Sequence, residues 1–244
     1  MTKTGAKKKR PLVIGALDFF VAGVPAHGYF EMQVAGLRKL VRPSRGLSGL
    51  NQTAEVCLIA LSAYFEAFCK AEFAAVINIC PTILRNFVER RKDAKLDLHN
   101  VLAMLGQMES KLGNLLSEGY DFGSAKDINA LYSDLLRITP FSQDEKKKYQ
   151  RFLSDRNLLV HHGGVYTFEY AAQRFTERTA PGMPHWSSLV VNKQHHERWA
   201  IFLLAMAQKI AATSREALEK FVESEGIVLT PEQKRAVKFL GYDE

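Results

Sequence analysis

Hydrophobic side chains recur in steps of three and four along most of the chain, which is the spacing of one helix face. Strand-like alternation is scarce by comparison. The pattern predicts an all-α fold, an up-and-down helical bundle with additional helices at both ends. The helices are expected at 27–42, 51–91 with a break at Pro81, 96–117, 127–138, 143–162 and 193–224, with a short one after Thr230.

The helix at 143–162 has the clearest ends. Ser142 and Glu145 have the spacing of a capping box, in which two side chains bind the free backbone N–H groups of the first turn. Gly163 and Gly164 are typical of a helix stop. A second capping box, Thr230 with Gln233, opens the short C-terminal helix, and Asn192 is expected to cap the helix before it.

The segment 165–191 breaks the helical pattern. Tyr166, Phe168 and Tyr170 alternate, and two prolines with a glycine follow at 181–184. We predict a loop or hairpin insertion here that covers a cleft. The predicted organisation is a basic disordered arm at 1–10, an N-terminal helical extension at 11–50, a helical bundle at 51–226 and a short C-terminal helix at 227–244.

The formal charge of +7 is concentrated at the N-terminus. The first ten residues carry five cations and no acid, and the rest of the chain carries 28 basic against 26 acidic residues. The arm either contacts RNA phosphates or is a solvated tail. The candidate RNA-binding residues are Lys7, Lys8, Lys9 and Arg10.

Cysteine usage and hydropathy favour a reducing cytoplasm. Cys57, Cys69 and Cys80 have no C-x-x-C spacing, so neither a disulfide framework nor a zinc site is expected. The apolar run from Trp199 to Ala207 is too short to span a membrane. His195 and His196 are expected to be packing or surface residues, because no acid or cysteine stands at metal-ligand spacing. We expect no metal and no nucleotide cofactor.

The stretch Asp155 to Gly164 carries the chemistry. Arg156 supplies a guanidinium, His161 an imidazole that can act as acid or base, and Asn157 an amide that both donates and accepts. These groups are sufficient to cleave a phosphodiester without a metal. His162 competes with His161 for the same role; we favour His161, and a cation capping the helix end is the alternative for His162.

Helix geometry tests whether these residues can share a site. On an ideal helix Asn157 and His161 lie about 40° apart, whereas Arg156 and His161 lie about 140° apart. Three things reconcile this separation: the reach of the arginine, loosening of the last turn, and a second copy of the helix across a two-fold axis.

The sequence Arg156-Asn157-x-x-x-His161 resembles the Arg-x4-6-His motif of the HEPN family (higher eukaryotes and prokaryotes nucleotide-binding domain). The apolar helix at 58–70, with Glu66 inside it, is similar to the opening helix of that family. The resemblance implies a metal-independent endoribonuclease that cleaves RNA by 2′-hydroxyl attack. It further implies a toxin or antiviral effector, a homodimer, and an antitoxin or regulatory partner protein.

Two other interpretations of the motif remain. One is a HEPN-like module that binds nucleotide, RNA or protein without cleaving. The other is a helical scaffold in which the motif arises by chance. Glu66 also has two interpretations: it orients Arg156 or His161 in the site, or it lies on an exposed stripe and pairs with Lys70.

Overall fold

The computed structural model of the chain describes residues 14–43, 51–92, 94–96, 98–103, 108–174 and 188–241. The predicted basic arm, with Lys7, Lys8, Lys9 and Arg10, lies outside these residues. The described part of the chain is helical throughout, with one isolated antiparallel bridge between Val165 and Ser188. The all-α prediction is confirmed.

The helices of the described part follow one another in chain order. Their bounds are η1 Ala16–Phe19, α1 Ala26–Leu40, α2 Gln52–Ile79, η2 Pro81–Ile83, α3 Leu84–Arg90, α4 Leu98–Ala103, α5 Met108–Glu118, α6 Ala125–Leu136, α7 Gln143–His162, α8 Phe168–Arg174, α9 Lys193–Ser224 and α10 Pro231–Leu240.

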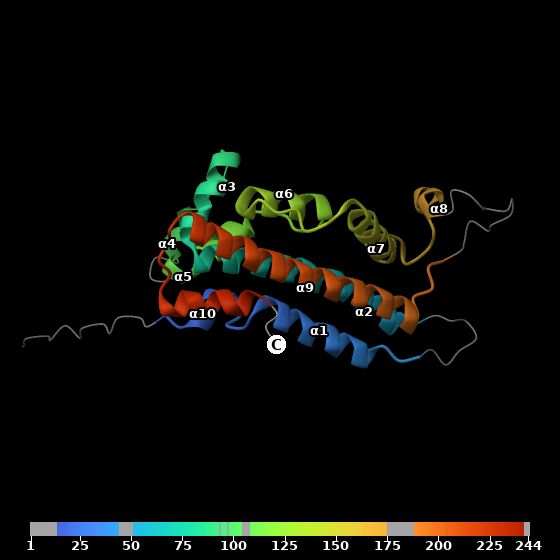
Figure 1. The fold of residues 1–244 in the computed structure, drawn as a ribbon. Coiled ribbons are helices and arrows are strands. Elements are labelled where there is room, and N and C mark those ends of the chain that lie inside the picture. The colour runs from blue at the N-terminus through green and yellow to red at the C-terminus, as the bar shows by residue number, and fades with distance from the viewer. Residues whose placement is uncertain are drawn as a thin grey trace, which may run out of the picture.

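The two longest helices, α2 and α9, lie side by side through the centre of the bundle (Figure 1). Helices α6 and α7 lie along one side of them, and α1 and α10 along the other (Figure 1). Every residue from Glu72 to the end of α2 is buried. A helical segment that is buried on all sides must be surrounded, so this part of α2 defines the core that the other helices cover.

Aromatic rings fill the space between α1, α2 and α7. Phe30 of α1 packs on Phe65 and Phe68 of α2, with ring centroids 5.7 and 5.5 Å apart. Tyr149 of α7 packs on Phe65 at 5.5 Å, and Phe152 packs on Trp199 of α9 at 5.4 Å. These contacts join α7 to both central helices.

A polar clamp holds α5 against α2. The buried Asn78 accepts a hydrogen bond from the Gly113 N–H at 2.7 Å, and its Nδ2 donates to Phe19 O at 2.9 Å. A Cβ at Gly113 would collide with the backbone of Ala74, so only glycine allows the two helices to approach this closely.

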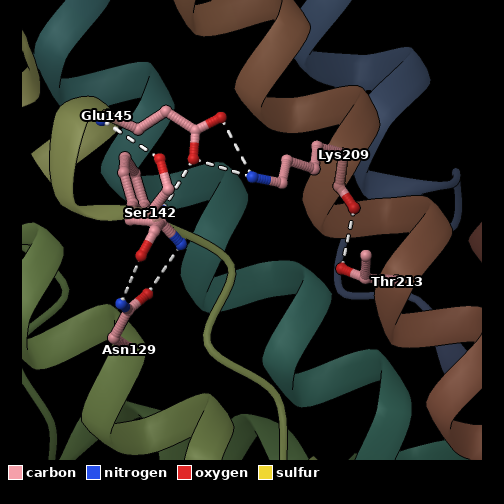
Figure 2. Close-up of polar contacts among 6 residues, drawn as sticks. Asn129, Ser142, Glu145, Lys209 and Thr213 are labelled. Carbon is pink, nitrogen blue, oxygen red and sulfur yellow. Dashed lines mark hydrogen bonds and ion pairs between the residues drawn. The ribbon is translucent and has the colours of Figure 1, made fainter.

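The start of α7 is anchored on two sides (Figure 2). Asn129 of α6 donates to Phe141 O and accepts from Phe141 N, both at 2.8 Å. The Ser142–Glu145 capping box forms as predicted, and Glu145 also accepts from Lys209 of α9 at 2.7 Å. The direction of α7 is therefore fixed before the chain reaches the motif.

The predicted helix at 96–117 is helical in its described parts, α4 and α5, and residues 104–107 between them lie outside the described residues. Another predicted element differs from the structure. The alternating aromatics after Val165 form the short helix α8 rather than a strand, because Thr167 Oγ1 accepts from the Tyr170 N–H at 3.1 Å and caps it. Residues 175–187 of that predicted insertion lie outside the described part.

No single described helix has the length and apolar character needed to cross a membrane. Helix α2 has this length and apolar character only when it is taken together with Pro81–Arg90, and the chain bends by 107° between the two segments.

Glu72 gives a prediction about stability. It is fully buried, neither carboxyl oxygen has a hydrogen-bond partner among the described residues, and burial raises its pKa from 4.5 to about 8. Because the folded state holds this proton more tightly than the unfolded state, stability falls as pH rises from 4.5 to 8. The slope in this window is about 1.4 kcal/mol per pH unit.

Glu72→Gln removes this ionisation, so the variant should lose less stability than the parent between pH 5 and pH 8. Urea unfolding at several pH values measures the difference. Glu118→Gln, at an exposed position of α5, controls for the substitution itself. An unchanged pH slope in Glu72→Gln would show that Glu72 ionises without cost in the folded protein.

Candidate functional site

Helix α7 ends at the predicted glycines. Gly163 is left-handed at φ 56°, and the Gly164 N–H donates to Leu158 O at 3.1 Å, which closes the last turn. After Gly164 the chain passes Val165, which pairs with Ser188 in the antiparallel bridge, and then enters α8. This turn brings α8 close to the C-terminal end of α7.

A pocket of about 200 Å³ lies between the end of α7 and α8. Asn157, His161 and His162 line it, so the structure brings together three of the five predicted site residues. Both imidazoles are exposed to solvent. The other lining residues are Gln150, Ser154 and Leu158 of α7, and Thr167, Glu169, Tyr170 and Gln173 at or before α8.

Arg156 does not line this pocket, as the angle of about 140° to His161 predicts for a single helix. Its Nη1 donates to Asn157 Oδ1 at 2.8 Å. Its Nε is buried and has no hydrogen-bond partner among the described residues. The Arg156 guanidinium is therefore linked to the pocket through its hydrogen bond to Asn157, which lines the pocket.

Glu66 lies on α2, partly buried. The described residues show neither a Glu66–Lys70 ion pair nor a direct contact of Glu66 with Arg156 or His161, whereas Lys70 lies over the Phe122 ring at 6.0 Å. Both interpretations of Glu66 stay predictions.

Glu66 and Arg156 do act on one common group, the Tyr149 hydroxyl. This hydroxyl is buried and unpartnered in the described part of the chain. Burial raises the pKa of Tyr149, Cys69 and Glu66 raise it further, and the Arg156 charge lowers it. The charges of Glu66 on α2 and Arg156 on α7 therefore act in opposite directions on the pKa of Tyr149.

The sequence analysis missed Asp155, which is fully buried next to the motif arginine. Its Oδ1 accepts from the Tyr170 hydroxyl of α8 at 2.8 Å. Its Oδ2 accepts from Trp199 Nε1 of α9 at 3.2 Å and lies 3.1 Å from His195 Nε2. One carboxylate therefore connects α7, α8 and α9 directly behind the pocket.

One signal in the sequence could have found Asp155. It lies on the apolar face of α7, between Phe152 and Leu158, where a charged side chain needs hydrogen-bond partners. The partners themselves are 15, 40 and 44 residues away in the chain, so only the fold reveals them.

This arrangement can support acid and base chemistry on an anionic substrate. Two exposed imidazoles and an amide face one pocket, and a guanidinium is bonded to that amide. In the described part of the chain, no three His, Cys, Asp or Glu residues are grouped so that they could hold a metal ion. Comparison with protein-family models, with curated proteins and with solved structures finds no match.

The Asp155 contacts predict that replacing this buried residue destabilises the protein, whereas replacing the exposed His161 does not. Asp155→Ala should lower the free energy of unfolding by about 3–5 kcal/mol, because Tyr170, His195 and Trp199 lose a shared buried acceptor. His161→Ala, at an exposed position, should change it by less than about 0.5 kcal/mol. Urea unfolding measures both values. Equal stabilities would mean that the Asp155 contacts do not hold the helices together.

Proposed function

We propose that this chain is a metal-independent endoribonuclease of the HEPN type, acting in the cytoplasm. The observation that carries the proposal is the pocket at the end of α7, which holds Asn157, His161 and His162, with Arg156 bonded to Asn157. These are the residues on which the resemblance to the HEPN motif rests. The all-helical fold is compatible with that family's bundle.

The chemistry uses His161 as the general acid or base. One imidazole removes the proton of the ribose 2′-hydroxyl, which attacks the adjacent phosphorus. A second imidazole protonates the leaving 5′-oxygen, and the charge on the phosphorane is stabilised by Arg156. Asn157 holds the Arg156 guanidinium at the edge of the pocket. Glu66 acts as a positioning residue whose charge, like that of Arg156, acts on the Tyr149 hydroxyl.

A homodimer completes this site. One chain supplies one Arg156, and that side chain lies beside the pocket rather than in it. A second α7 packed across a two-fold axis would add a second arginine and a second pair of histidines. Val160 and Val165, 44% and 47% exposed at this end of α7, offer apolar surface for the contact.

We assign the enzyme to the class of toxins or antiviral effectors, whose activity an antitoxin or regulatory partner protein restrains. The second candidate function is a HEPN-like module that binds RNA, nucleotide or protein without cleaving. The position of Arg156 outside the pocket favours this second candidate. Cleavage assays on site variants separate the two.

His161→Ala should reduce RNA cleavage at least about 10²-fold, because it removes the acid or base. Arg156→Ala should do the same through loss of charge stabilisation, and Arg156→Lys should also be impaired, since an ammonium lacks the planar pair of donors. His162→Ala should keep more activity than His161→Ala. Initial rates on a fluorescent RNA measure these effects, with melting temperatures as the folding control.

If His162→Ala is inactive and His161→Ala is active, then the motif histidine is His162. If all four variants cleave like the parent, then the pocket is not the catalytic site. A parent protein that binds RNA and cleaves none would support the binding module instead.

Mixed assembly tests the dimer. If two copies of His161 are needed in one site, activity should follow the square of the wild-type fraction when wild type and His161→Ala are refolded together. An equal mixture should then retain about a quarter of the activity. A proportional loss, to about half, would show that each chain works alone and that both proton transfers use His161 and His162 of one protomer.

A further inference from the structure

The pocket continues into a row of polar side chains along the exposed face of α7. Lys147, Gln150, Ser154, Asn157 and His161 follow one another in steps of three and four, so they lie on one face of the helix. Lys146 borders the row beside Gln150. We name these six residues the α7 track. From Lys147 to His161 it is about 21 Å long, at 1.5 Å per residue.

The track is basic although the chain outside its first ten residues is nearly neutral. Between Lys146 and His162 the sequence has five cations, and Asp155 is the one acid. Asp155 is buried on the other side of α7, where it contacts α8 and α9. Its charge therefore does not offset the track at the surface.

The two lysines of the track differ from Lys148, the next cation in the sequence. Lys148 lies over the Phe202 ring of α9 at 4.5 Å and points away from the track. Lys146 and Lys147 make no ion pair with any described residue. Glu145 is bound to Lys209, Asp144 is exposed at the first turn, and Glu169 at the edge of the pocket accepts from Gln173 at 3.3 Å. Lys147 therefore faces solvent along the approach to the pocket, and the partly buried Lys146 lies next to it in the sequence.

We infer that the α7 track binds the backbone of single-stranded RNA and leads it into the pocket at His161. A single helix face presents one row of donors, which fits the phosphates of one strand rather than two. At about 3.4 Å per stacked nucleotide, 21 Å corresponds to roughly six nucleotides. The amides of Gln150 and Asn157 can contact sugar or base edges between the phosphates.

The inference rests on the proposed function for the class of ligand, but binding can be measured without cleavage. The probe is a fluorescent 12-nucleotide single-stranded RNA with 2′-O-methyl groups throughout, which blocks 2′-hydroxyl attack. The variant is Lys146→Gln/Lys147→Gln. The matched control is Lys234→Gln/Lys238→Gln, on α10 at the other side of the central helices (Figure 1). It removes two exposed cations that make no ion pair with a described residue.

Binding to the full chain should weaken several-fold in Lys146→Gln/Lys147→Gln and stay unchanged in the control. The slope of log K against log salt should become shallower by about 1.4, because each single-strand phosphate contact contributes about 0.7. A short dinucleotide substrate should be cleaved equally by the track variant and the parent, since it occupies the pocket alone.

Three results would overturn the inference. Equal loss in both variant pairs would show a general charge effect, and no loss in either would show that RNA does not touch the track. Tighter binding of a duplex of the same sequence, or of polyglutamate with the same dependence on Lys146 and Lys147, would assign the surface to another partner. If the track binds RNA while no cleavage is detected, the proposed enzymatic function fails and the inference stands.

Discussion

The burial of the second half of α2 is the constraint on which the rest of the fold depends. Every residue from Glu72 to Cys80 is buried, so this part of the helix does not face water on any side. Asn78 and Gly113 hold α5 against it, and the aromatic cluster around Phe65 holds α1 and α7. Helix α7, which carries the candidate site, is positioned in part by this shared core.

Helix α7 is held by side-chain contacts near both of its ends. Asn129 and Lys209 hold its first turn (Figure 2). Asp155 joins its last turns to Tyr170 and Trp199. Between these anchors the exposed face is left for ligand. A site built on a helix that is fixed in this way keeps its side chains in one geometry, which acid–base and electrostatic catalysis require.

Local signals in the sequence predicted α7 almost completely, because capping boxes and glycine stops act over a few residues. The grouping of Asn157 with His161 followed from helical spacing, as did the separation of Arg156. The pocket wall was not predictable in this way, because Asp155 bonds to Tyr170, His195 and Trp199 across as many as 44 residues. The α7 track was not predicted, because the chain outside its first ten residues is nearly neutral as a whole. Helix α8 was not predicted, because its aromatic residues also suit a strand.

We propose that Arg156 and His161 cleave RNA by attack of the ribose 2′-hydroxyl. Incubation of the purified chain with RNA in excess EDTA, followed by identification of the product ends, tests this directly. We expect cleavage that EDTA does not inhibit, with a 2′,3′-cyclic phosphate on one fragment and a 5′-hydroxyl on the other. Strict dependence on magnesium, or fragments that carry a 5′-phosphate, would contradict it.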